Sequence, residues 1–188
     1  MKTTNLLNQT IFLFLLIGLL AACKKDDDGA STPPDNSNEG ELITTLSLTF
    51  VDTGGTHPNV TATFRDSDGG GGNTPTQFDT IRLADSTTYS VTILLLNESR
   101  TPADTISNEV LDEGDEHLFC FSPSGINLTV VNSDSDGTFG IGLQSTWTTT
   151  NASNGTVQIE LKHQPGIKDG TCAPGETDVQ VNFVTEIL

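Results

Sequence analysis

Apolar and polar residues alternate in short runs throughout the chain from residue 41 onward. Examples are "LITTLSLTFV" at 42–51 and "NVTATFRD" at 59–66. Successive side chains of a strand point to opposite faces of a sheet, so this alternation, rich in Thr and Val, predicts strands with one buried face. The other runs of this kind occupy 78–84, 87–99, 117–123, 126–133, 143–150, 156–163 and 178–188. We therefore expect about nine short strands.

The runs are separated by clusters of turn-forming residues, mostly Gly, Asp, Asn and Ser. The Asn154-Gly155 pair lies between two alternating runs, and this dipeptide favours the tight turn of a β-hairpin. We therefore predict a hairpin turn at this pair.

One stretch, "TPADTISNEVLDEGDE" at 101–116, does not alternate. Its apolar residues Ile106, Val110 and Leu111 have helical spacing, which predicts a single short helix over 103–112. Many short strands with one helix predict an all-β fold. We expect an antiparallel, immunoglobulin-like β-sandwich in which the helix crosses between the two sheets.

The first 22 residues have a different organisation. A short polar start with a single lysine is followed by an apolar run at 11–20, which is too short to span a lipid bilayer. The sequence "LAAC" then ends at Cys23 and resembles the bacterial lipobox, in which the cysteine is lipidated and becomes the first mature residue. We predict a lipoprotein signal peptide at 1–22 and lipidation of Cys23. The alternatives are an ordinary signal peptide with a chance cysteine and an uncleaved anchor.

Residues 23–40 are acidic and polar, with too few apolar side chains to form a core, which predicts a disordered tether. The "KKDDD" at 24–28 resembles the signal that sends Bacteroidetes lipoproteins to the outer face of the outer membrane. A simple solvated charge run, or a final position on the periplasmic face, is the alternative. The predicted β-sandwich domain then spans residues 41–188.

The chain is strongly acidic, with 25 acidic and 8 basic residues and a formal net charge of -17. Such a chain repels nucleic acid and anionic lipid headgroups, so neither is expected as a partner. Cations and basic partners are favoured instead.

Several segments occur in a familiar order, among them "DEGDEHLFCFSP" at 112–123, "NSDSDGTFGIGL" at 132–143 and "GETDVQVNF" at 175–183. In this order the chain resembles a family of small, mostly uncharacterised Bacteroidetes lipoproteins, often labelled "type 1 periplasmic binding fold superfamily". The resemblance implies an outer-membrane lipoprotein. The label implies alternating β and α units in two lobes, whereas the pattern of this chain predicts the β-sandwich.

Two cysteines remain besides Cys23. Cys120 lies in the predicted strand "HLFCF" and Cys172 in the loop "DGTCAPGE". Outside the cytoplasm two such cysteines favour a disulfide, which would tie the loop to a core strand. The alternative is a buried, inert thiol at Cys120 and an unrelated exposed Cys172.

Acidic residues in two turns resemble part of a calcium-binding loop. Asn132, Asp134 and Asp136 place oxygen ligands at alternate positions before a glycine, although Leu143 stands where such a loop needs a glutamate. Asp66 and Asp68 form a weaker copy of the pattern. We favour strand-connecting turns, with calcium binding as the alternative.

Two histidines offer a second kind of metal site. His117 follows Asp115-Glu116 at the start of one predicted strand, and His163 ends another. If those strands are neighbours, two imidazoles and a carboxylate could bind a transition metal such as zinc. Each histidine alone is more often a surface residue of a strand.

The sequence contains no phosphate-binding glycine loop, nucleophile elbow or zinc-protease motif, so we do not expect an enzyme. We expect a lipid-anchored binding lipoprotein of the outer membrane that faces the cell exterior. Its expected partners are the membrane, through the lipid, and an outer-membrane uptake receptor or another surface protein. The alternatives are a calcium-stiffened structural or adhesive surface module and a metal-handling protein that uses His117 and His163.

Overall fold

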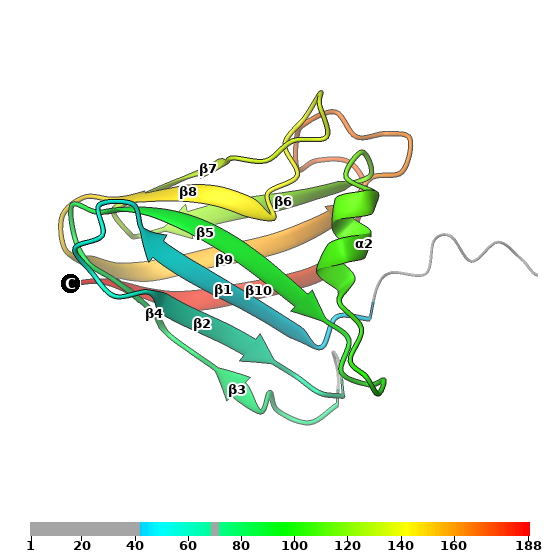
Figure 1. The fold of residues 1–188 in the computed structure, drawn as a ribbon, viewed down its shortest axis with the longest axis horizontal. Coiled ribbons are helices and arrows are strands. Elements are labelled where there is room, and N and C mark those ends of the chain that lie inside the picture. The colour runs from blue at the N-terminus through cyan, green and yellow to red at the C-terminus, as the bar shows by residue number, and fades with distance from the viewer. Residues whose placement is uncertain (1–41, 69–71) are drawn as a thin grey trace, which may run out of the picture. The chain divides into compact units, whose positions relative to one another are not determined.

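The computed structural model of the chain describes residues 42–68 and 72–188. In these residues two β-sheets pack face to face as a sandwich (Figure 1). The predicted signal peptide, the predicted lipidation site Cys23 and the predicted tether lie outside the described residues.

Ten strands form the two sheets in the described part of the chain. One sheet has six strands in the order β3 (Gln77–Phe78), β2 (Val60–Arg65), β1 (Thr45–Asp52), β5 (Thr88–Leu96), β8 (Gln144–Thr149) and β7 (Leu128–Asn132). The other has four strands in the order β4 (Ile81–Leu83), β10 (Glu176–Ile187), β9 (Ser153–His163) and β6 (His117–Ser124). All pairs are antiparallel except β4 with β10. The predicted β-sandwich is thus confirmed.

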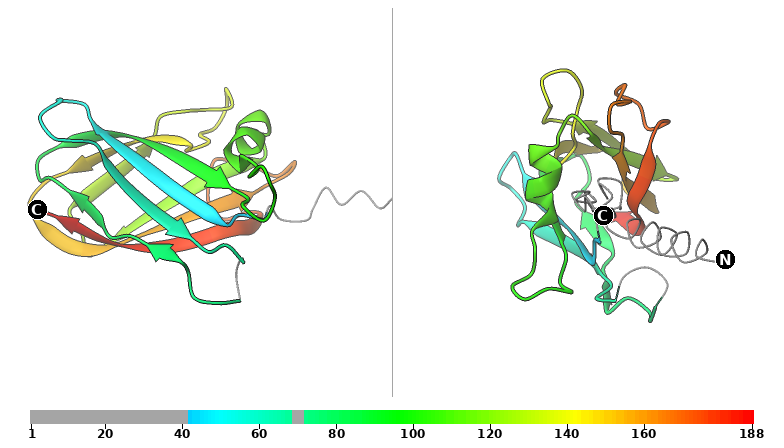
Figure 2. Two further views of the ribbon diagram at one scale, coloured as in Figure 1. Left: turned by 60° about the horizontal axis from the view of Figure 1, so that its bottom comes forward. Right: turned by 90° about the vertical axis from the view of Figure 1, so that its right-hand side faces the viewer.

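The helix α2 (Ile106–Asp112) connects β5 of the first sheet to β6 of the second and lies at one end of the sandwich (Figures 1 and 2). Ile106 and Val110 are buried, as their helical spacing predicts. The helix begins three residues later than the predicted Ala103. The backbone of Asp104 instead pairs in both directions with that of Asn97, which holds it in an extended conformation.

The tenth strand arises because the run at 78–84 divides between the sheets. β3 pairs with β2 in the six-stranded sheet, whereas β4 pairs with β10 in the other. The chain changes sheets between the two strands, so this one short run supplies an edge strand to each sheet.

The hairpin predicted at Asn154-Gly155 is wrong. Both residues lie within β9, and Gly155 pairs with Thr185 of β10. A Cβ atom on Gly155 would lie 2.3 Å from the carbonyl oxygen of Ser124. The glycine therefore permits a close approach of backbones inside the sheet, a role that short-range sequence patterns do not distinguish from a turn.

The core lies between the sheets and is built from the inward-facing residues of the alternating runs. Phe50 and Trp147 contact each other edge to face with ring centroids 5.2 Å apart. The indole N–H of Trp147 donates to the hydroxyl of Ser145, so this fully buried ring leaves no polar atom without a partner. None of the helices in residues 42–68 and 72–188 is long and apolar enough to cross a membrane.

Candidate metal centre

Two histidines from different strands meet at the end of the sandwich that carries α2. His117 is the first residue of β6 and His163 the last residue of β9, and the antiparallel register pairs them directly. Alternation along the strands places them on the same face as the core residues Phe119 and Leu161. Their rings stack with centroids 4.8 Å apart and planes 9° apart. The sequence left open whether the two strands are neighbours, and the register shows that they are.

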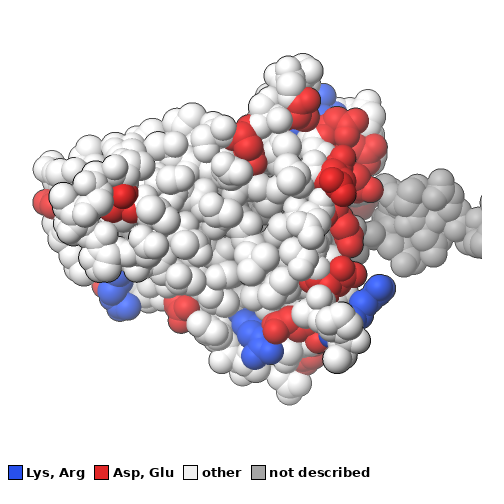
Figure 3. Space-filling model, in the orientation of Figure 1, with Lys and Arg blue, Asp and Glu red and all other residues white. Residues whose placement is uncertain are grey.

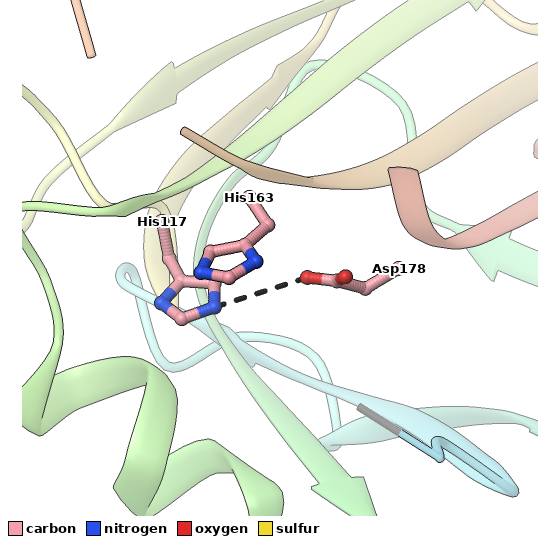
Figure 4. A group of neighbouring side chains, drawn as sticks. All are labelled: His117, His163 and Asp178. Atoms are coloured by element: carbon pink, nitrogen blue, oxygen red, sulfur yellow. Dashed lines mark ion pairs between the residues drawn. The ribbon is translucent and has the colours of Figure 1, made fainter. Parts of the chain in front are cut away.

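A carboxylate from a third strand joins them. The pairing of β10 with β9 shifts between Thr177 and Val179, so Asp178 is the extra residue of a β-bulge. A bulge interrupts the regular alternation and can redirect a side chain. The side chain of Asp178 is only 2% exposed and points toward the histidines (Figure 4).

We call His117, His163 and Asp178 the His–Asp cluster. One possible ligand atom from each residue lies within 4.8 Å of the other two. The Nε2 atom of His117 is 3.8 Å from Oδ2 of Asp178, which is too long for a hydrogen bond (Figure 4). The cluster is the one group of three or more potential ligand side chains that comes together in the described residues.

Two polar atoms of the cluster have no hydrogen-bond partner although they are buried. They are Nε2 of His117 and Oδ2 of Asp178. The other ring nitrogen of His117, Nδ1, lies 3.1 Å from the carbonyl oxygen of Glu113. A carbonyl can only accept, so Nδ1 carries a proton, and in the neutral ring Nε2 has a free lone pair. That lone pair faces Asp178.

The charge of Asp178 is disfavoured by its surroundings. Burial raises the pKa of the Asp178 carboxyl, while the nearby His163 and His117 act in the opposite direction. In an ionised Asp178, the buried Oδ2 has no hydrogen-bond donor, which is costly unless a cation compensates the charge.

The cluster opens to the surface beside another carboxylate. Oε2 of Glu116 is 3.5 Å from Nε2 of His163, and the Glu116 side chain is 38% exposed. Figure 3 shows acidic side chains along the side of the molecule that carries α2, whereas the broad face of the six-stranded sheet has few charges. The acidic residues in and after α2 are Glu109, Asp112, Glu113, Asp115 and Glu116. They give this end a negative potential that attracts cations.

The residues predicted as a possible calcium loop behave differently. In this acidic loop, residues 132–142, Asp134 accepts backbone N–H groups from Gly142 and Gln144. Oδ1 of Asp136 accepts the N–H groups of Thr138 and Phe139. The side-chain amide of Asn132 lies 3.4 Å from the carbonyl oxygen of Phe119. These contacts are those of a strand-connecting turn, and calcium binding here stays a prediction.

A buried lysine completes the acidic loop. The ammonium of Lys168 donates to Oδ2 of Asp136 at 2.7 Å and to the carbonyl oxygen of Gly114 at 2.6 Å. The side chain of Asp136 is only 9% exposed, and that of Lys168 only 3%. The ammonium and the two amides lower the pKa of Asp136 to about 2. The cation that this loop needs is thus supplied by the protein itself.

The weaker acidic pair, Asp66 and Asp68, lies beside residues 69–71, which are outside the described part. Asp68 accepts hydrogen bonds from the backbone and side chain of Asn73. Burial and the neighbouring Asp68 raise the pKa of Asp66. These two residues do not join the His–Asp cluster.

The predicted disulfide is confirmed. Cys120 of β6 and Cys172 are joined, with Cα atoms 6.0 Å apart. The bond attaches the segment between β9 and β10 to the outer face of the four-stranded sheet. Lys168, which contacts the acidic loop, precedes Cys172 in this segment, and Asp178 of the His–Asp cluster follows it. The disulfide therefore restrains the segment that carries one residue of each site.

Sequence reasoning identified both histidines but not Asp178. The carboxylates that stand beside His117 in the sequence are Asp115 and Glu116. Glu116 does approach His163, but the carboxylate within the cluster comes from a residue 61 positions beyond His117. The bulge that turns Asp178 inward leaves no mark in the alternation of "DVQVNF", because the extra residue precedes the regular part of the strand.

Comparison with protein-family models, curated proteins and solved structures finds no match to this chain.

Proposed function

We propose that the protein is a lipid-anchored binding lipoprotein of the outer membrane, facing the cell exterior. The observation that carries the proposal is the Cys120–Cys172 disulfide in a domain that follows a lipobox-like sequence. Disulfides of this kind are typical of proteins outside the reducing cytoplasm. The lipobox supplies an anchor that needs no spanning helix, because acyl chains partition into the bilayer.

The proposed activity is binding rather than catalysis. The end of the sandwich near α2 combines the His–Asp cluster with a surrounding negative potential. This arrangement favours a cationic ligand. A partner protein in the same membrane, such as an uptake receptor, would receive or present that ligand.

The alternative, a calcium-stiffened structural module, has less support. The acidic loop already has a buried cation, Lys168, that links it to the residues following α2. The loop is therefore stiffened by contacts within the chain, and a calcium ion would have to displace them.

Fractionation of cells that express the full chain tests the anchor. In a Bacteroidetes host, the wild-type protein is expected in the outer-membrane fraction, with a mature mass that includes the acyl groups. Cys23→Ser removes the acceptor thiol, and we expect this variant to leave the outer-membrane fraction. A Cys23→Ser variant that stays there like wild type, or a mature mass without acyl groups, would overturn the proposal.

A second variant separates anchoring from display. Replacing Asp26, Asp27 and Asp28 together by Ala keeps Cys23 and the lipid. Digestion of intact cells with an added protease is expected to remove the wild-type protein but to spare this variant. Equal protection of both proteins would place the domain on the periplasmic face.

A further inference from the structure

We propose that His117, His163 and Asp178 bind a divalent transition-metal ion of the zinc type, with Glu116 as a fourth ligand from the solvent side. The inference rests on the proposed binding function and names its ligand. It concerns the folded domain alone, so its test is separate from that of the membrane anchor.

The strongest support is the pair of buried atoms without partners. Nε2 of His117 and Oδ2 of Asp178 belong to side chains that are 1% and 2% exposed, and they face each other. Buried polar groups are nearly always hydrogen-bonded, so such atoms need an explanation. One cation between them would satisfy both at once.

The orientation of His117 is that of a metal ligand. Its Nδ1–H donates to the carbonyl oxygen of Glu113, which fixes the tautomer that leaves Nε2 free. Histidines that bind metals usually donate their second ring N–H to a carbonyl or carboxylate in this way. The contact also limits rotation of the ring, so this ligand is already positioned.

The donor set selects the class of ion. Two imidazole nitrogens with carboxylate oxygens suit zinc and its neighbours in the first transition series. Calcium and magnesium prefer sites made only of oxygen ligands. The cluster therefore belongs to a different class from the calcium loop that the acidic motifs suggested.

Binding requires a small rearrangement. Two donors on one tetrahedral zinc lie about 3.3 Å apart, given bonds of about 2.0–2.1 Å. The 3.8 Å between His117 and Asp178 is close to this value, and all three ligand atoms of the cluster lie within 4.8 Å of one another. The stacked rings have nearly parallel planes, so the ring of His163 must turn for its lone pair to converge with that of His117. His163 is the more exposed of the two, with its side chain 13% accessible.

Glu116 lies beside His163 and is more exposed than the residues of the cluster. Its carboxylate is already 3.5 Å from His163, and its exposed side chain can follow that ring as it turns. The neighbouring Asp115 is exposed and, unlike Glu116, forms no ion pair with a histidine in the described part of the chain. Replacing each of these two adjacent carboxylates in turn therefore compares a proposed ligand, Glu116, with a neighbouring residue that is not a ligand, Asp115.

The competing explanation is a purely structural ion pair between protonated His117 and Asp178. The 3.8 Å separation leaves no hydrogen bond between them, and both atoms remain without a partner. An ion pair without hydrogen bonds gives a buried carboxylate little compensation. The two explanations predict opposite effects of replacing Asp178.

Titration of the untagged, full-length protein in detergent tests the site directly. The protein is first treated with a chelator, and zinc chloride is then added in a calorimeter. We expect one zinc ion per chain with a dissociation constant in the micromolar range or tighter, and no heat from calcium chloride. The absence of saturable zinc binding would overturn the inference but would leave the anchor proposal intact, because fractionation tests that separately.

Variants identify the ligands. His117→Ala is expected to weaken zinc binding by about 100-fold or more, because loss of an outer-shell partner alone costs about 10–100-fold. His57→Ala, which removes a histidine outside the cluster, is the control and should bind like wild type. Glu116→Gln is expected to weaken binding by about 10-fold, whereas Asp115→Asn, with the same charge change, should have little effect. Equal effects of the last two variants would remove Glu116 from the ligand set.

Asp178→Asn separates metal binding from a structural role. Without metal, this variant should melt at the same temperature as wild type or higher, because a buried charged oxygen without a partner, Oδ2, is replaced by an uncharged group. With zinc, wild type should gain thermal stability and the variant should not. A lower melting temperature of the metal-free variant, together with unchanged zinc binding, would favour the structural ion pair and overturn the inference.

Discussion

The acidic loop, through Lys168, and the His–Asp cluster, through His117, both contact the backbone just after α2, yet their carboxylates have opposite surroundings. In the acidic loop, Asp134 and Asp136 accept hydrogen bonds from backbone amides, and Lys168 provides a buried positive charge. In the cluster, Asp178 faces a ring nitrogen at 3.8 Å, and neither atom has a partner.

The difference shows how a candidate cation site is distinguished from a turn. A count of acidic residues favours the acidic loop, because its motif resembles a calcium loop. The state of each donor atom favours the cluster, because a ligand atom must be free to bind. The pKa values follow the same division: that of Asp136 is lowered to about 2 by its donors, and that of Asp178 is raised by burial.

The largest effect is expected from removing the link that the two regions share. The double variant Cys120→Ser, Cys172→Ser should lose about 2–5 kcal/mol of unfolding free energy, the usual range for a native disulfide. Because Cys172 lies between Lys168 and Asp178, zinc binding should weaken as well. Chemical denaturation of the variant measures the loss, with reduced wild-type protein as the comparison. A loss confined to stability would show that the cluster is held by its strands alone.

The next largest effect concerns the cation in the acidic loop. Lys168→Met leaves the nearly buried Asp136 without its positive partner and should cost about 3 kcal/mol of unfolding free energy. Arg82→Met breaks the more exposed ion pair of Arg82 with Glu186 and should cost less than about 1 kcal/mol. Urea unfolding of both variants tests the contrast. Equal losses would mean that the loop does not depend on its buried lysine.

Acidity should affect the acidic loop in a defined range. The pKa of Asp136 is lowered from 3.8 to about 2 in the folded protein, so its ionised form contributes stability above pH 3.8. That contribution is lost as the pH falls from 3.8 through about 2. Asp136→Asn should therefore reduce the pH dependence of unfolding free energy in this range. Denaturation curves at pH 5, 4, 3 and 2 measure it, and an unchanged slope would contradict the assignment.

The smallest expected effect is that of calcium on the acidic loop. Because its carboxylates already accept hydrogen bonds, millimolar calcium should shift the melting temperature by less than about 1 °C. Zinc at the same concentration should raise it through the cluster. A calcium shift that Asp134→Asn abolishes would reverse the comparison and restore the calcium-loop interpretation of the motif.

Most of the fold could be predicted from local patterns. Alternation found the strands, since a half-buried strand needs an apolar residue at every second position. It could not show that the run at 78–84 divides between two sheets, because that depends on which partner strands are adjacent. The turn-forming pair Asn154-Gly155 misled for the same reason, since the contact that requires Gly155 comes from Ser124, 31 residues earlier.

The candidate site was predictable only in part. Histidines are scarce in this chain, so His117 and His163 at the ends of two predicted strands were visible as potential ligands. Aspartates are abundant, and nothing in the sequence separated Asp178 from the others. The acidic loop has the most ligand-like spacing, but the carboxylate oxygens of Asp134 and Asp136 already accept hydrogen bonds from within the chain.

By itself, the sequence determined the all-β class, the acidic charge and the lipobox-like start, because each depends on composition or on short-range spacing. It also predicted the Cys120–Cys172 disulfide, since only these two cysteines remained besides Cys23. The tertiary structure decided which side chains meet. Strand register placed His117 beside His163, and the β-bulge turned Asp178 toward them. Which polar atoms lack a partner depends on every neighbour in space, and for that reason only the folded chain distinguishes a candidate metal centre from an acidic turn.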